Sequence, residues 1–286
     1  MTEEPFARVL HLPEVGSTST ALREAVAADP AAWPHLSALV ADHQTAGRGR
    51  TGRSWHTPPG AALTASLLLR PRVPLERAPW LTLLAGLAVV RAVRAGAGDR
   101  AGGVGLKWPN DVLVDDGGPA LAGWGTARKV GGILTELLPP SGDGGPIAVV
   151  GIGVNLGQDA AALPVESATS LALAGMPVPA PVVLLDAVGH ELVGLVSRWE
   201  EHVGDADAAG LRAEVAAVCL TLDRDVRVDR PGGTVLHGRA EALDADGCLC
   251  VRDAGGVLHR VLAGDVLHVR ADTGSAESGT DVNLEL

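Results

Sequence analysis

Residues 43–55 read His-Gln-Thr-Ala-Gly-Arg-Gly-Arg-Thr-Gly-Arg-Ser-Trp, and the rest of the chain is organised around this stretch. Glycines and arginines are interleaved in it, namely Gly47, Arg48, Gly49, Arg50, Gly52 and Arg53. No acidic residue occurs from 44 to 75, although the whole chain has a formal net charge of −11 at pH 7. Glycine lets the main chain bend close to a ligand, and guanidinium groups offer planar sets of donors that match phosphate or carboxylate. The stretch therefore predicts an anion-binding loop.

Length and composition narrow the class of protein. A chain of 286 residues can bury a full core, and one large domain with a smaller one is expected. The acidic balance argues against a general nucleic-acid binder, because such proteins carry broad basic faces. The N-terminal Met-Thr-Glu-Glu-Pro lacks the pattern of a signal peptide, and the longest apolar run, residues 80–90, is short for a membrane span. We therefore expect a soluble cytoplasmic protein that binds neither nucleic acid nor membrane.

Lysine is scarce in this chain, which has 21 arginines but only two lysines, Lys107 and Lys129. Such a bias is typical of GC-rich genomes, and residues that persist against it tend to be irreplaceable. Both lysines lie in short stretches marked by glycine or tryptophan. The cysteines lie elsewhere, and the spacing of Cys248 and Cys250 supplies too few ligands for a metal site, so we expect free thiols.

Apolar runs and turn residues predict a mixed order of helices and strands. The expected strands are at 7–16, 37–42, 62–69, 105–107, 111–114, 129–138 and 147–156, and the expected helices begin at 17–20, 77, 180 and 205. Short alternating runs with glycine turns from 221 to 270 predict a small β-barrel. The predicted divisions are a catalytic domain at 1–219, the barrel at 220–270 and a disordered acidic tail at 271–286.

The arginine loop has other interpretations. Gly47, Gly49 and Gly52 match the spacing of a dinucleotide-binding fingerprint, but no helix opens after them and no acidic residue follows about twenty positions on. A phosphate-binding P-loop motif is absent from the sequence. An arginine-glycine RNA-binding tract fits poorly, because the loop holds three arginines in an acidic protein.

Residues 107–111 read Lys-Trp-Pro-Asn-Asp and place a cation, an amide and a carboxylate around one tight turn. This set suits a nucleoside triphosphate, with lysine on a phosphate, asparagine on a polar edge and aspartate on a metal or hydroxyl. The alternative is an ordinary turn with a surface ion pair. Lys129 stands beside Gly131 and Gly132, where a solvated lysine is the commoner explanation.

Four stretches together resemble the biotin protein ligase family: residues 47–55, 107–111, 129–136 and 151–156. The resemblance runs from about residue 16 to 270. It implies an α+β fold, with a mixed-sheet catalytic domain like that of class II aminoacyl-tRNA synthetases followed by an SH3-like β-barrel. It also implies activation of biotin by Mg-ATP to biotinyl-5′-AMP, and transfer of biotin to a lysine on a biotin carboxyl carrier protein domain of a biotin-dependent carboxylase.

The resemblance also implies roles for individual residues. Biotin would be bound by Ser17, Thr18, Gln44, Gly47, Arg48, Arg50, Lys129, Gly132 and Ile133. ATP and the adenylate would be bound by Arg50, Arg53, Trp55, Lys107, Asn110, Asp111, Asn155 and Arg270. The catalytic residues would be Arg48, Arg50, Asp111 and Lys129, and Asp111 is also the candidate partner of Mg²⁺.

Ser19 departs from the family pattern, which usually has asparagine there. About sixteen residues precede Ser17, too few for the N-terminal helix-turn-helix of some members, so we expect an enzyme that is not a DNA-binding repressor. The alternatives are a lipoate or octanoate ligase on the same fold and a non-catalytic sensor of biotin or its adenylate. Both a monomer and a homodimer are compatible with the sequence. The arginine loop, residues 47–58, is expected to be poorly ordered or displaced without ligand.

Overall fold

The structure is a computed structural model and describes residues 4–115, 117–138 and 146–268. Its main element is a seven-stranded sheet. In spatial order the strands are β1 (Arg8–Val15), β2 (Ser37–Gln44), β5 (Ala62–Leu69), β9 (Ile147–Asn155), β8 (Ala127–Leu138), β7 (Asp111–Asp115) and β6 (Val104–Lys107). The β1–β2 pair is parallel, and every other neighbouring pair is antiparallel. The predicted mixed sheet is confirmed.

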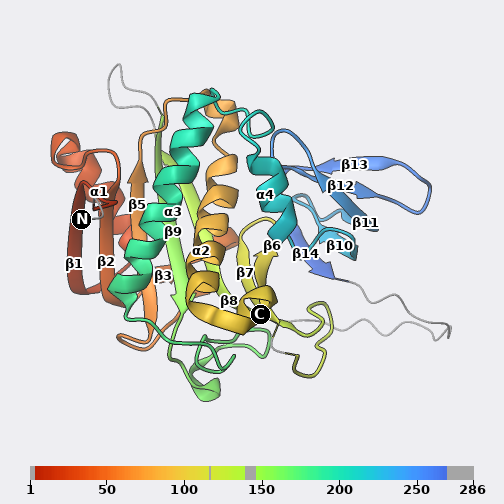
Figure 1. The fold of residues 1–286 in the computed structure, drawn as a ribbon, viewed down its shortest axis with the longest axis horizontal. Coiled ribbons are helices and arrows are strands. Elements are labelled where there is room, and N and C mark those ends of the chain that lie inside the picture. The colour runs from red at the N-terminus through yellow and green to blue at the C-terminus, as the bar shows by residue number, and fades with distance from the viewer. Residues whose placement is uncertain (1–3, 116, 139–145, 269–286) are drawn as a thin grey trace.

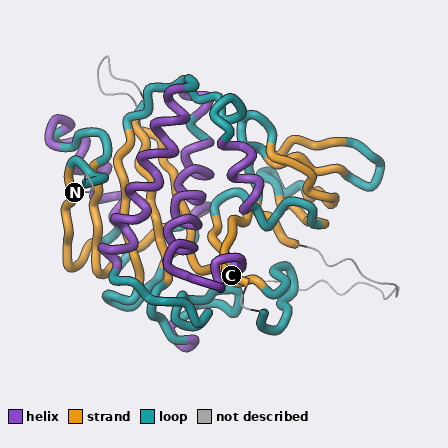
Figure 2. Tube along the Cα trace, in the orientation of Figure 1, coloured by secondary structure: helices purple, strands orange, loops and turns teal. Residues whose placement is uncertain are grey.

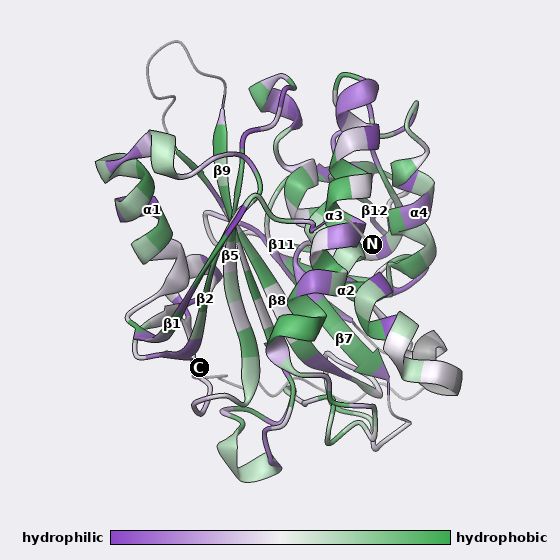
Figure 3. Cartoon of the chain, turned by 60° about the vertical axis from the view of Figure 1, so that its left-hand side comes forward, coloured by the Kyte–Doolittle hydropathy of each residue, from purple (hydrophilic) through white to green (hydrophobic). Residues whose placement is uncertain are grey.

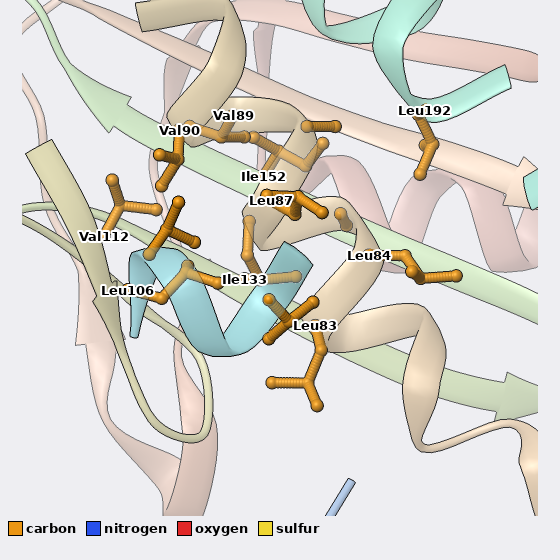
Figure 4. Packing of buried hydrophobic residues seen from close by; sticks show 14 of the residues in the cluster. Leu83, Leu84, Leu87, Val89, Val90, Leu106, Val112, Ile133, Ile152 and Leu192 are labelled. Atoms are coloured by element: carbon orange, nitrogen blue, oxygen red, sulfur yellow. The ribbon is translucent and has the colours of Figure 1, made fainter. Parts of the chain in front are cut away.

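Helices cover the two faces of this sheet. The long helices α2 (Trp80–Ala97) and α3 (Pro181–Glu201) lie side by side on one face (Figures 1 and 2). Val150 and Ile152 of β9 pack on this side, and Figure 4 shows Ile152 among the leucines of α2. The shorter helix α1 (Thr18–Ala28) covers the other face, where Val149 packs in a separate apolar cluster. The alternation along β9 follows from the two-residue period of a strand.

Three glycines line the sheet face that carries α1, namely Gly132, Gly151 and Gly153, and together they are called the glycine floor. Gly151 and Gly153 of β9 alternate with the core residues of that strand, and Gly132 of β8 pairs with Gly153. A Cβ atom at Gly153 would lie 2.7 Å from the ring of Trp55, and one at Gly151 would lie 2.9 Å from Ser19 Oγ. Only glycine therefore lets these two side chains lie so close to the sheet.

The C-terminal part is a second, smaller sheet. After α4 (Leu211–Val218), five antiparallel strands follow, in the spatial order β13 (Leu258–Val261), β12 (Leu249–Arg252), β11 (Val235–Leu243), β10 (Asp225–Asp229) and β14 (Asp265–His268). This small antiparallel domain is consistent with the predicted SH3-like barrel. The indole N–H groups of Trp80 and Trp108 donate to its Ala245 and Gly247 carbonyls at 2.8 and 2.9 Å, which fixes it against the larger domain (Figure 1).

Some predicted elements differ from the structure. The last helix of the large domain is limited to 211–218, because residues 205–210 form turns that end at Gly210, with a φ of 72°. The arginine loop contains a hairpin that was not predicted, formed by β3 (Gly47–Arg48) and β4 (Ser54–Trp55). Arg270 and the tail at 271–286 lie outside the described residues.

Helix α2 spans Trp80–Ala97 and so begins three residues after the expected start at 77. At 18 residues and a mean hydropathy of 1.4, it is long and apolar enough to cross a membrane. However, 72% of it is buried inside the protein, between the sheet and α3. Much of the central sheet is coloured as hydrophobic in Figure 3. Burial, and not length, identifies α2 as the core helix of a soluble domain.

Candidate functional site

The arginine hairpin lies over the glycine floor. Its strands pair Gly47 with Trp55, and a Cβ atom at Gly47 would lie 2.3 Å from the Trp55 carbonyl oxygen. The tip turns through Thr51 and Gly52, whose φ angles are 52° and 79°. The ring of Trp55 rests on Gly153 of the floor. The loop follows a defined path between Gly47 and Trp55, and its disorder or displacement in the absence of ligand stays a prediction.

Each arginine of the hairpin has a different protein acceptor. Arg48 forms an ion pair with Glu136 of β8, at 2.8 Å between Nη2 and Oε1. Arg53 forms an ion pair with Asp265 of β14, which ties the hairpin to the C-terminal domain.

The guanidinium of Arg50 instead donates to the amide oxygen of Asn110 at 2.8 Å. Within the described residues, no carboxylate lies within ion-pair distance of Arg50. Because an amide oxygen carries no net charge, Arg50 keeps its positive charge uncompensated, unlike Arg48 and Arg53.

The turn at 107–111 joins β6 to β7 and is held against β8 by hydrogen bonds. Asn110 makes two hydrogen bonds with the Ile133 main chain: its carbonyl accepts from the amide at 2.9 Å, and its Nδ2 donates to the carbonyl oxygen at 3.0 Å. Asp111 forms an ion pair with Lys129 at 2.7 Å. The turn thereby brings the predicted residues of three motifs together: Arg50, Asn110 and the Asp111–Lys129 pair.

Lys107 is a buried cation at the end of β6, with 5% of its surface exposed. Its Nζ lies 3.9 Å from the centre of the Trp124 ring. Burial lowers the pKa of Lys107 to about 8, with Asp111 opposing the shift and Lys129 adding to it. Burial together with the Lys107 charge also lowers the pKa of His268 to about 4, so this neighbouring imidazole is neutral at physiological pH.

Helix α1 brings its first turn to the end of β2. Ser17 is the N-cap of this helix and accepts from the Thr20 amide, and the Thr18 amide donates to Gln44 Oε1 at 2.8 Å. Hydroxyl residues cap helices in this way, so this local structure was predictable. Ser17, Thr18 and Gln44 are all buried, next to the glycine floor.

Two predicted site residues have side chains that are buried and contact other parts of the protein. Ile133 is 1% exposed, and its side chain lies in the core among residues of α2 (Figure 4), on the face opposite Trp55. Strand alternation explains this, because its neighbour Gly132 occupies the site face. The Asn155 side chain is buried and held within the protein, since it donates to the Thr169 carbonyl at 2.9 Å and accepts from Gln158 at 2.8 Å.

The structure adds three site residues that the sequence did not indicate: Trp124, Glu136 and Asp265. Trp124 lies in a glycine-rich stretch, and a tryptophan in such a stretch could have been recognised as a candidate site residue from the sequence. Glu136 ends the family stretch at 129–136 and could have been found there, whereas Asp265 is recognisable only through its arginine partner.

Asp111 is the only predicted metal partner. Among the described residues, no group of three or more histidine, cysteine, aspartate or glutamate side chains is placed to hold a metal ion. A single carboxylate still fits Mg²⁺, which is commonly held by one or two carboxylates together with substrate phosphates.

The fold and the site define a class of proteins with an arginine hairpin over a mixed sheet, a Lys-Trp-Pro-Asn-Asp turn beside it, and a small antiparallel domain behind. The family model described as "Biotin/lipoate A/B protein ligase family" matches residues 14–155. The model described as "Biotin protein ligase C terminal domain" matches residues 221–269.

Relatives agree with these matches. The biotin--[acetyl-CoA-carboxylase] ligase of Mycobacterium tuberculosis is 36% identical over 233 residues, which cover 81% of this chain and 79% of that protein. The bifunctional ligase/repressor BirA of Bacillus spizizenii is 32% identical over 227 residues, or 78% of this chain and 64% of that protein. The chain therefore belongs to the biotin protein ligase family.

Solved structures share the fold. The biotin protein ligase from Aquifex aeolicus in complex with biotin and ATP superposes with a TM-score of 0.69 and 28% identity, covering 93% of this chain and all of that one. The ligase from Leishmania major in complex with biotinyl-5-AMP gives a TM-score of 0.53 and 26% identity, covering 90% and 99%.

Proposed function

We propose that this protein activates biotin with ATP to form biotinyl-5′-AMP, and then transfers biotin to a lysine on the biotin carboxyl carrier protein domain of a biotin-dependent carboxylase. The observation that carries the proposal is the meeting of Arg50 with the Asn110 turn beside the Asp111–Lys129 pair. This junction places cationic groups from two motifs at one edge of the glycine floor. The family membership supports the same reaction.

The first step joins two anions, and this explains the charge at the site. A biotin carboxylate oxygen attacks the α-phosphorus of ATP, a new O–P bond forms, and the bond to pyrophosphate breaks. Carboxylate and triphosphate repel each other, so positive charge at their meeting point lowers the barrier. Arg50, which has no carboxylate partner among the described residues, is the group we assign to this point.

The lysines have different parts in the proposal. Lys129, already held at 2.7 Å by Asp111, is oriented to contact the activated carboxyl oxygen. Lys107 is shielded from water, and a shielded cation attracts a phosphate more strongly than a hydrated one. Mg²⁺, when bound with ATP, supplies further charge neutralisation, and Asp111 is the residue that would hold it.

The biotin side of the site is assigned to the α1 face of the sheet. Ser17, Thr18 and Gln44 line one end, and Gly47 and Gly132 let Trp55 lie close to the site. Ile133 contributes only its main chain. Arg48 and Arg53 reach substrate only by exchanging their present partners, Glu136 and Asp265.

In the second step the ε-amine of the acceptor lysine attacks the mixed anhydride. A C–N bond forms, AMP leaves, and the amine loses a proton. No covalent intermediate on the enzyme is needed, because binding brings the two reactants together. We place the reaction in the cytoplasm, where the carboxylase substrate is made.

The test is incubation of the protein with biotin, Mg-ATP and a carrier domain, followed by mass spectrometry of the carrier. The proposal expects one lysine to gain a biotinyl group, with release of AMP. Modification only with lipoate or octanoate would identify a ligase for those acids. Binding of biotin without release of AMP would identify a sensor.

A further inference from the structure

The amide of Gln44 has a defined orientation. The main-chain N–H of Thr18 lies 2.8 Å from one terminal atom of the Gln44 side chain. A main-chain N–H can only donate, so that terminal atom must be the carbonyl oxygen Oε1. The other atom, Nε2, faces the hairpin, since a Cβ atom at Gly47 would lie 3.0 Å from it. The amide thus presents a donor to the site.

Three hydroxyl groups continue the hydrogen-bonded chain that begins at this amide, and the donor in each hydrogen bond can be assigned in turn. The Thr18 hydroxyl lies 3.0 Å from Gln44 Oε1, so its single hydrogen is donated there. Ser66 of β5 lies 2.8 Å from Thr18 Oγ1 and must therefore donate to it. Ser19 lies 2.9 Å from Ser66 Oγ and must donate in turn. The hydroxyl relay, Ser19 to Ser66 to Thr18 to Gln44, therefore runs one way.

The relay is sealed from solvent. Ser66 is completely buried, and Thr18, Ser19 and Gln44 are exposed by 3%, 5% and 8%. Water cannot substitute for a missing member at such sites, and hydrogen bonds in a buried chain strengthen one another. Ser66 lies opposite Gly151, on the α1 face of the sheet and beneath the site. Serine at position 19, in place of the usual asparagine, has a role as the first donor of this chain.

We propose that Ser66 is a positioning residue for the acid substrate, and that it acts through Thr18 to hold Gln44 with its Nε2 donor toward the ligand. The substrate atom that meets Gln44 is then a hydrogen-bond acceptor, such as an oxygen of the acid. This inference rests on the proposed function, since biotin is the acid. Ser66 itself does not touch substrate.

The experiment measures biotin-dependent pyrophosphate release in Ser66→Ala, with biotin and ATP varied separately. Loss of one buried hydrogen bond behind the amide raises the KM for biotin about three- to tenfold. The KM for ATP stays unchanged, because the relay ends on the biotin side. In a Gln44→Ala background, Ser66→Ala has no further effect on the KM for biotin, since the group through which it acts is gone.

The matched control is Ser37→Ala. Ser37 is an equally buried serine at the far end of β2, and its hydroxyl donates to the Pro34 carbonyl at 2.7 Å. Its removal leaves the KM for biotin unchanged. An equal rise in Ser37→Ala, or an undiminished effect of Ser66→Ala without Gln44, would overturn the proposal.

Two further measurements keep the test decisive. If Ser66→Ala does not fold, Ser66→Cys fills the site with a slightly larger side chain and a weaker donor, and a rise in the KM for biotin is still expected. Failure of the proposed function itself would appear as a wild-type protein that releases no pyrophosphate with biotin. In that case calorimetric titration with biotin tests the relay separately, and affinities that are equal in wild type and variant would refute it.

Discussion

At the scale of single residues, the arginines of the hairpin differ in whether a carboxylate neutralises their charge. Among the residues that the structure describes, Arg48 and Arg53 each face a carboxylate, whereas Arg50 donates to the amide of Asn110. Neutral partners fix a guanidinium in place without removing its charge. Arg50 is therefore the arginine of the hairpin that is both positioned and available to an anion.

Arg50→Ala is expected to reduce biotin-dependent pyrophosphate release about 100- to 1000-fold, the usual effect of losing one donor at a developing charge. The melting temperature should stay close to that of the wild type, because Asn110 remains held by Ile133. The control is Arg72→Ala, which removes an exposed arginine paired with Glu200 away from the site. Wild-type pyrophosphate release in Arg50→Ala would remove the hairpin from the mechanism.

The buried Lys107 predicts a pH dependence. Its pKa is lowered from 10.5 to about 8, so above pH 8 the ammonium loses its proton and its attraction for phosphate. We expect kcat/KM for ATP to fall as pH rises through 8. Folding responds oppositely: between pH 8 and 10.5 the unfolded chain holds the extra proton, so this group's contribution to stability rises with pH.

Trp124 supplies the control for this pH profile. Trp124→Ala admits water to the ammonium, which should move the alkaline limb to higher pH, while Trp124→Phe keeps a ring face and most of the shielding. An alkaline limb that stays in place in Trp124→Ala would show that Lys107 is not the titrating group.

At the scale of elements, the arginine hairpin is held from both domains. Gly47 and Trp55 close it within the large domain, and Arg53 ties it to β14 of the small one. Both partners of the Arg53–Asp265 pair are partly exposed, so their contribution is on the order of 1 kcal/mol or less. A contact of this size can hold a loop and still let it open for substrate.

Asp265→Asn should therefore increase amide hydrogen exchange in residues 47–55 a few fold, with biotin and ATP suppressing the increase. Asp253→Asn is the matched control, because Asp253 pairs with His259 at 2.7 Å within the same small domain. Equal exchange in wild type and Asp265→Asn would mean that this ion pair does not restrain the hairpin.

Sequence reasoning found the elements whose signals are local. The Lys-Trp-Pro-Asn-Asp turn, the capped start of α1 and the alternating strands of the small domain are each encoded within a few residues. The hairpin strands β3 and β4 are two residues each and too short to leave a pattern. The acceptors Glu136 and Asp265 lie 88 and 212 residues from their arginines, so only the folded chain shows that they pair with them.

At the scale of the whole molecule, the two faces of the seven-stranded sheet have different roles. Its apolar face packs against α2 and α3, and its glycine-lined face carries the hairpin, the relay and the turn at 107–111. The apolar runs predicted the individual strands, and the resemblance to the biotin protein ligases implied that they form a mixed sheet. We expected both Gly132 and Ile133 at the site, but adjacent residues of a strand point to opposite faces, so the Ile133 side chain faces the core while Gly132 faces the site.

The central claim is that this glycine-lined face adenylates biotin. The most direct measurement is exchange of labelled pyrophosphate into ATP, performed without any acceptor protein. We predict exchange that requires both Mg²⁺ and biotin and that falls about 100- to 1000-fold in Arg50→Ala. Exchange that proceeds equally well without biotin, or that depends on lipoate instead, would contradict it.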